Sequence, residues 1–261
     1  MHHHSAFTLT DMLAAMVLIV IVFVLYMGTC GQSSPRRQAR GMQNSVHLLG
    51  IRSGMVSFAQ GNKDYYPGLT ANGEKATESV AADAGQKSYG FATADGTLTA
   101  YRFAVLVRGS YFSRDYLKNP AETNDKIIIP VAGQNFADGS AYSYAMLNIS
   151  DVKAPRVREW KATNNSRAAV VSDRNIGPDA TGTGAQSLHT SQGEGWRGTV
   201  CYNDGHVIFE TTDMLKTSYG KSGTVVADLL FSDQEKTEGN VANADAAMVF
   251  KAGDSYVNQQ P

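Results

Sequence analysis

The sequence predicts an α+β fold in which a long N-terminal helix, first transmembrane and then amphipathic, packs on an antiparallel β-sheet head. Three observations predict this fold. An unbroken apolar run covers Phe7 to Met27, and an amphipathic pattern extends from Pro35 to about Gln60. The rest of the 261-residue chain is rich in turn-forming residues, including many of its 25 glycines. Such a composition favours a β domain with long loops.

The apolar run from Phe7 to Met27 carries one charge, Asp11, close to its start. At about 1.5 Å per residue the run covers roughly 30 Å, the thickness of the apolar core of a bilayer. A carboxylate inside such a segment costs a few kcal/mol, so the acid needs a favourable environment. Two interpretations stay open: Asp11 is a hydrated acid at the end of a plain membrane anchor, or it pairs with a cation of a neighbouring chain.

A second helix is predicted after a break at Gly28, Gly31 and Ser33-Ser34-Pro35. Pro35 suits the first turn of a helix, with Ser34 as its N-cap. Apolar residues then recur at helical spacing in two adjacent stripes: Ala39, Met42, Val46, Leu49, Val56 and Ala59, and Leu48, Ile51, Met55 and Phe58. Together they form one wide apolar face, which we expect to pack against a domain.

Strands are predicted in the rest of the chain. The clearest signal is a hairpin over Gly198–Thr211, where Asn203-Asp204-Gly205 marks a tight turn. Further apolar or alternating segments predict strands at 126–131, 141–147, 167–172 and 245–250, while 101–107 fits either a short helix or a strand.

Composition and motifs exclude several classes of function. The net charge is −1 and the basic residues are scattered, which argues against a nucleic-acid partner. The sequence lacks zinc-finger spacing, a P-loop, a dinucleotide fingerprint and a Ser-His-Asp signature. Asp173, His189, Asp204 and His206 are residue types of metal or acid–base sites, but turn chemistry explains them as well. We therefore predict no enzyme, no resident cofactor, and two free thiols at Cys30 and Cys201.

The N-terminal segment Ala6-Phe7-Thr8-Leu9-Thr10-Asp11, followed by the apolar run, resembles the prepilin N-terminus of type IV pilins and type II secretion pseudopilins. In that family a membrane peptidase cuts before a Phe and methylates the new amine, and an acid nearby pairs with the Phe amine of another subunit. The resemblance implies cleavage between Ala6 and Phe7, methylation of Phe7 and pairing of Asp11 with a neighbouring Phe7. The chain departs from the family in having Ala6 for Gly, Asp11 for Glu and a leader without Lys or Arg.

Two later stretches resemble a large bacterial subfamily of prepilin-like proteins. The first combines Arg36-Arg37-Gln38-Ala39-Arg40 with Asn44-Ser45-Val46-His47-Leu48-Leu49-Gly50. The second runs from His189 to Asp204-Gly205-His206 and resembles a His-spacer-Asp-Gly motif, although fourteen residues separate His189 from Asp204 where nine are usual.

Some type II pseudopilins bind Ca²⁺ in a C-terminal loop. The oxygen-bearing residues at the corresponding end of this chain are Asp233, Asn240, Asn243 and Asp245. Their carboxylate and amide oxygens could ligate calcium, whereas the alternative is an ordinary solvated loop.

The resemblance implies a ladle-shaped, pilin-like molecule with a leader (1–6), a transmembrane half-helix (7–31), an amphipathic half-helix (35–61) and a β-rich head (62–261). Its implied function is that of a structural subunit of a type IV pilus-like or type II secretion pseudopilus fibre, polymerised through the N-terminal helix. The implied partners are prepilin peptidase, copies of itself, other pilin-like subunits and the inner membrane. There it would be a single-pass protein with a periplasmic head, and after assembly a periplasmic or extracellular fibre.

A second class of function stays open at this point. The chain could be a membrane-anchored or lipidated envelope protein, with Cys30 as the lipidated residue and a head that binds a ligand or a glycan.

Overall fold

The computed structural model describes residues 9–29, 35–177, 184–190, 194–219, 225–233 and 246–251. The chain divides into two compact units, Met1–Ala39 and Arg40–Pro261. Among the described residues, every strand and the buried core belong to the second unit.

The N-terminal region forms two separate helices, α1 (Leu9–Thr29) and α2 (Pro35–Gln60). Helix α2 begins at Pro35, whose fixed φ and missing N–H suit a first helical position. The predicted fold class, with one long transmembrane and amphipathic N-terminal helix on a sheet, is therefore wrong.

No helix within the described ranges is long and apolar enough to cross a membrane. Such a helix needs about 20 consecutive, predominantly apolar residues. The predicted transmembrane half-helix at 7–31, and with it the predicted single-pass localisation in the inner membrane, is corrected on this ground.

The main sheet is antiparallel, and its five strands have the order β4-β3-β2-β1-β7. They are β1 (Tyr144–Leu147), β2 (Ala169–Asp173), β3 (Gly198–Tyr202), β4 (Val207–Glu210) and β7 (Met248–Val249). A smaller antiparallel sheet pairs β5 (Met214–Thr217) with β6 (Val226–Leu229). Strands β1, β2 and β3 are buried along their whole length, so both faces of the main sheet are covered at its centre.

The predicted hairpin at 198–211 is confirmed. Cys201 pairs with Val207 and Val200 with Ile208, and Gly205 in the turn has a φ of +95°. This is a left-handed conformation that glycine adopts without steric cost. Strands β1, β2 and β7 also overlap the segments predicted for them, and the ambiguous segment at 101–107 lies in α3 (Thr99–Arg108).

The predicted strand at 126–131 is wrong. Its β-branched residues do not share one environment: Ile127 is buried in the core, whereas Ile128 is 71% exposed. The backbone N–H of Ile128 donates to the carbonyl of Ser140, at 2.7 Å, and no ladder continues from this bond. A β-rich composition therefore produced a loop, because strand formation depends on a neighbouring strand as well as on propensity.

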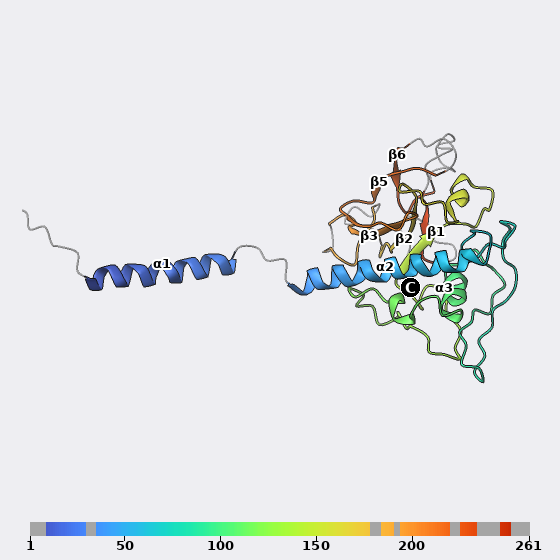
Figure 1. The fold of residues 1–261 in the computed structure, drawn as a ribbon, viewed down its shortest axis with the longest axis horizontal. Coiled ribbons are helices and arrows are strands. Elements are labelled where there is room, and N and C mark those ends of the chain that lie inside the picture. The colour runs from blue at the N-terminus through green and yellow to red at the C-terminus, as the bar shows by residue number, and fades with distance from the viewer. Residues whose placement is uncertain are drawn as a thin grey trace, which may run out of the picture. The chain divides into compact units, whose positions relative to one another are not determined.

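Helix α2 lies across the Arg40–Pro261 unit, with strands on one side and α3 on the other (Figure 1). Its inner residues Leu48, Ile51, Met55 and Ala59 are buried in the common core. Two short 3₁₀ helices, η1 (Arg114–Leu117) and η2 (Pro155–Glu159), complete the described elements.

The first of the two stripes predicted on α2 is only partly buried: Ala59 lies in the core and Val56 packs against it. Met42, Val46 and Leu49, which we call the outer stripe, face solvent. The interpretation of both stripes as a single packed face is thus half right.

Candidate functional site

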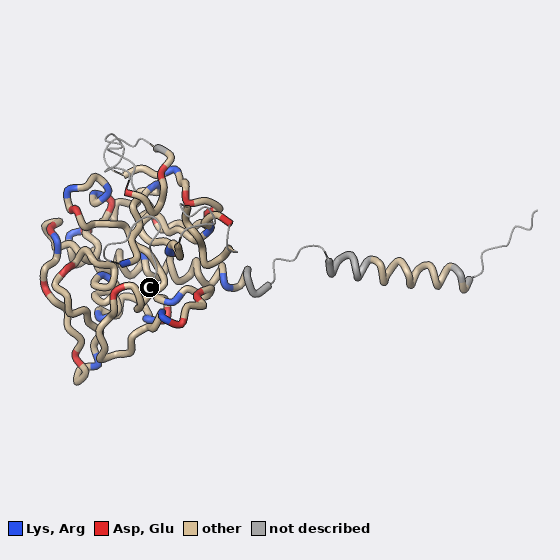
Figure 2. The backbone as a smooth tube through the Cα atoms, turned by 180° about the vertical axis from the view of Figure 1, so that it is seen from behind, with Lys and Arg blue, Asp and Glu red and all other residues tan. Residues whose placement is uncertain are grey.

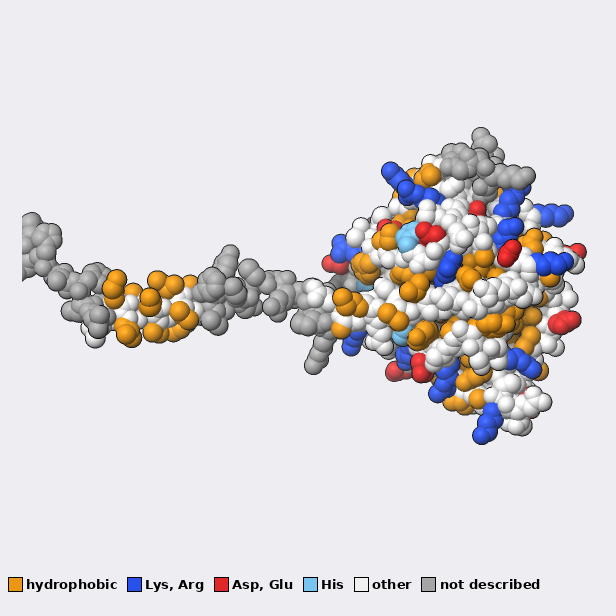
Figure 3. Space-filling model, viewed as in Figure 1, with side chains coloured by type: hydrophobic (Ala, Val, Ile, Leu, Met, Phe, Trp, Pro, Cys, Tyr) orange, Lys and Arg blue, Asp and Glu red, His pale blue; other side chains and the backbone are white. Residues whose placement is uncertain are grey.

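The largest apolar surface in the described residues lies on α1. Nine large apolar side chains are between 50% and 72% exposed: Met12, Leu13, Met16, Val17, Leu18, Ile19, Val20, Ile21 and Val22. Consecutive residues of a helix point in different directions, so these exposed side chains lie on all sides of the helix. Figure 3 shows the part of this apolar surface that faces the viewer. Asp11, near its start, is the one charged residue in the sequence of α1, whereas charges of both signs are scattered over the Arg40–Pro261 unit (Figure 2).

The outer stripe is a second exposed apolar surface, on α2 in the Arg40–Pro261 unit. Met42, Val46 and Leu49 are 74%, 55% and 45% exposed. Their spacing of four and three residues aligns them along one side of the helix. Exposed apolar side chains in such a line are typical of a surface that another element covers.

On the opposite side of α2, Asn44 forms hydrogen bonds with the sheet. Its side-chain nitrogen donates to both carboxylate oxygens of Asp173, at 2.9 and 3.0 Å, and to the hydroxyl of Thr199, at 2.8 Å. Its side-chain oxygen accepts a hydrogen bond from the hydroxyl of Tyr144, at 2.8 Å. Asn44 is fully buried. Every polar atom of its amide is therefore satisfied by β1, β2 or β3.

Asp173, at the end of β2, is the centre of this network. It also accepts hydrogen bonds from the side-chain nitrogen of Asn119 (2.6 Å) and the backbone N–H of Thr199 (2.7 Å). His189 Nε2 lies 2.9 Å from the same carboxylate. Burial, with the negative charge of Asp173 acting in the same direction, raises the pKa of Tyr144 well above its ordinary value. The network is thus a buried carboxylate surrounded by donors from four segments of the chain.

Arg52 forms a second contact of α2, with the turn of the β3–β4 hairpin. The Arg52 guanidinium donates to the backbone carbonyl of Asn203 and to the side-chain oxygen of Asn164, the latter at 3.3 Å. The hydroxyl of Tyr66 donates to Asn203 Oδ1 at 2.6 Å, and burial raises the pKa of Tyr66 to about 12. A β-carbon on Gly205 would come within 3.2 Å of the Arg52 guanidinium, so the turn approaches the helix closely.

The four residues of the predicted His-spacer-Asp-Gly motif do not form one site. His189 pairs with Asp173, and Asp204 pairs with His206 across the turn, at 2.5 Å. Gly205 serves the turn itself. Sequence reasoning considered Asp173 only as a candidate metal or acid–base residue, and it missed Asn44 and Asn119 as its partners.

The remaining predicted site residues are only partly described. Asp233 forms an ion pair with Arg156, whose two terminal nitrogens donate to the two carboxylate oxygens at 3.4 and 3.0 Å. Asn240, Asn243 and Asp245 lie outside the described residues, as do Ala6, Phe7 and Cys30. Asp11 lies in the first turn of α1.

Metal and thiol chemistry place different requirements on metal-ligating side chains and on the buried thiol. The described residues contain no group of three or more His, Cys, Asp or Glu side chains placed to hold a metal ion. Cys201 is buried and free, and burial raises its pKa to about 12. A thiol in that state is a poor nucleophile.

Comparison with known protein families, curated proteins and solved structures gives no match.

Proposed function

We propose that this chain is a structural subunit of a type IV pilus-like or type II secretion pseudopilus fibre and that it polymerises through α1. The observation that carries the proposal is the apolar surface on all sides of α1. Burying a Val, Leu, Ile or Met side chain contributes about 1.5–3 kcal/mol. Nine such side chains make the association of α1 with apolar surfaces of other copies strongly favourable.

Asp11 gives this association an axial register. In the proposed fibre, a peptidase cuts between Ala6 and Phe7, and the new amine of Phe7 is methylated. The amine remains a cation, and the Asp11 carboxylate of a neighbouring subunit pairs with it. A buried acid is tolerable only with such a partner, and one fixed pair per subunit selects a single axial position among many equivalent apolar contacts.

The outer stripe of α2 offers a second surface to neighbouring copies. The Asn44 and Arg52 contacts hold α2 on the sheet and the hairpin turn, so this stripe has a constant orientation on its unit. A docked helix with an exposed apolar stripe presents a pre-organised interface, which lowers the entropy cost of association.

The proposal is tested on full-length protein made in cells that contain a prepilin peptidase. Mass spectrometry is expected to find N-methyl-Phe at position 7 as the mature N-terminus. A lipidated Cys30, or an intact N-terminus in those cells, contradicts the proposal and favours the envelope-protein alternative.

The role of Asp11 is tested by fibre yield, measured by sedimentation and electron microscopy. Asp11→Ala is expected to reduce assembly by about tenfold or more, because loss of one paired charge corresponds to several kcal/mol. Asp11→Glu keeps the charge and serves as the matched control, with assembly close to that of the natural chain. Equal yields from all three proteins would rule out the pairing.

A further inference from the structure

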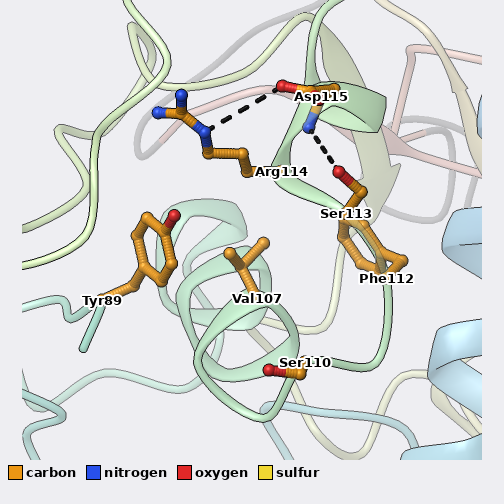
Figure 4. A pocket seen from close by; sticks show the side chains of 7 residues that line it. All are labelled: Tyr89, Val107, Ser110, Phe112, Ser113, Arg114 and Asp115. Carbon is orange, nitrogen blue, oxygen red and sulfur yellow. Dashed lines mark hydrogen bonds and ion pairs between the residues drawn. The ribbon is translucent and has the colours of Figure 1, made fainter. Parts of the chain in front are cut away.

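A pocket of about 440 Å³ lies at the end of α3 in the Arg40–Pro261 unit (Figure 4). This volume falls within the usual range of small-molecule sites. Its lining comes from three segments: the loop before α3, the last turns of α3, and the following loop with η1. The lining residues are Tyr89, Val107, Ser110, Phe112, Ser113, Arg114 and Asp115.

The apolar part of the pocket is held in place by packing. Val107 is buried, and the Tyr89 ring packs edge to face on Phe136, with ring centroids 6.3 Å apart. The ring of Phe112 is stacked on that of Tyr116, at 6.4 Å. Two aromatic rings and a buried valine thus form a preformed apolar surface, and Tyr89 and Arg114 stand on the same side of the pocket (Figure 4).

The polar part of the pocket combines a donor with an acceptor. Arg114 is positioned by a hydrogen bond from one terminal nitrogen to the carbonyl of Pro130, at 3.1 Å. Its Nε lies 4.0 Å from a carboxylate oxygen of Asp115, which is too far for a hydrogen bond. Both groups therefore retain hydrogen-bonding capacity, and their opposite charges leave the pair without net charge.

Hydroxyl groups complete the lining. Within the described part of the chain, the hydroxyls of Tyr89 and Ser110 have no hydrogen-bond partner. The Ser113 hydroxyl accepts a weak hydrogen bond from the backbone N–H of Asp115, at 3.4 Å, and its own proton is available. The pocket thus presents several donors and acceptors beside an apolar wall.

We propose that this pocket binds a neutral carbohydrate unit. Each sugar hydroxyl is both donor and acceptor, so two adjacent hydroxyls can accept from Arg114 and donate to Asp115. The C–H face of a pyranose ring is apolar and suits the Tyr89 ring. A purely apolar ligand would desolvate Arg114 and Asp115 without compensation, and the neutral Arg114–Asp115 pair gives an anion no net electrostatic attraction.

This inference goes beyond the proposed fibre function and does not depend on it, because the pocket contains no residue of α1 or α2. A fibre subunit with such a pocket would display a glycan-binding site, but an unassembled chain would bind in the same way.

The test uses the full-length protein and the methyl glycosides of glucose, galactose, mannose and N-acetylglucosamine as probes, with binding measured by saturation-transfer NMR and titration. At least one neutral glycoside is expected to bind. Asp115→Asn is expected to weaken binding up to about fivefold, since it removes a charged acceptor that is 81% exposed and therefore screened by water. Asp125→Asn changes an exposed acid outside the pocket and is expected to leave binding unchanged.

The aromatic wall is tested separately. Tyr89→Ala is expected to abolish binding, whereas Tyr89→Phe keeps the ring and restores most of it. Circular dichroism of each variant checks that the fold is retained. The proposal is overturned if none of the four glycosides binds. It is also overturned if Asp115→Asn and Tyr89→Ala both leave binding unchanged, or if the protein binds glucuronate or sulfate in preference to the neutral glycosides.

Discussion

The side-chain amide of Asn44 on α2 lies 2.9 and 3.0 Å from the two carboxylate oxygens of Asp173 on β2, although 129 residues separate them in the sequence. Both residues are fully buried. The contact joins the amphipathic helix to the centre of the main sheet and leaves the outer stripe on the opposite side of the helix.

Replacement of Asn44 by Ala tests this contact. The change leaves the buried Asp173 carboxylate without one of its donors and Tyr144 without its acceptor, so we expect a loss of about 1.5–3 kcal/mol in the free energy of unfolding. Urea denaturation measures it. Gln43→Ala, on the exposed neighbouring position, is the matched control and should stay within about 0.5 kcal/mol of the natural chain. Similar losses for the two variants would mean that the network adds little to stability.

Two glycines of α2 predict opposite effects of the same substitution. A β-carbon on Gly50 would overlap the ring of Tyr116, whereas one on Gly41 would meet nothing within 4 Å. The Tyr116 ring stacks on His47 and Phe112, with centroids 5.0 and 6.4 Å away, which limits its freedom to move aside.

We therefore expect Gly50→Ala to destabilise the protein by about 1–3 kcal/mol through overpacking. Gly41→Ala should stabilise it by up to about 1 kcal/mol through helix propensity alone. Thermal unfolding of the two variants distinguishes these outcomes, and a stabilising Gly50→Ala would show that α2 does not lie against Tyr116.

Stability should depend on pH through His47. Burial lowers the pKa of His47 below its ordinary value of 6.5, against smaller opposing effects of the Lys118 carbonyl and the Asp115 charge. The folded protein then binds fewer protons at His47 than the unfolded chain does. The contribution of His47 to the free energy of unfolding is therefore lost as the pH falls from 6.5 through its lowered pKa.

Urea denaturation of the natural chain and of His47→Gln measures the effect at about pH 7.5 and about pH 5. These two pH values lie on either side of the ordinary histidine pKa of about 6.5. The natural chain is expected to lose more stability on acidification than the variant does. An identical pH dependence would show that His47 does not contribute.

Local signals in the sequence predicted a large part of the fold. The Asn203-Asp204-Gly205 turn and its flanking alternation located the β3–β4 hairpin, because turn geometry and side-chain alternation are properties of neighbouring residues. The start of α2 at Pro35 was predicted for the same kind of reason. The segment at 126–131 shows the limit, since its strand-like composition found no partner strand.

The candidate site was less accessible to sequence reasoning. The spacing on α2 identified the apolar positions but not which of them are buried. His189 was grouped with Asp204, yet it pairs with Asp173. Asn44 and Asn119 carried no signal of their buried role, because a hydrogen bond between distant segments leaves no local pattern.

The sequence by itself determined the helical and turn periodicities, the apolar run with its one acid, and the absence of a recognisable catalytic motif. These follow from residue type and short-range spacing. Only the tertiary structure decided which side of α2 faces the sheet, how donors from distant segments surround Asp173, and that Arg114, Asp115 and Tyr89 line one pocket. Each of these depends on contacts between segments far apart in the chain, whose formation is governed by packing of the whole unit.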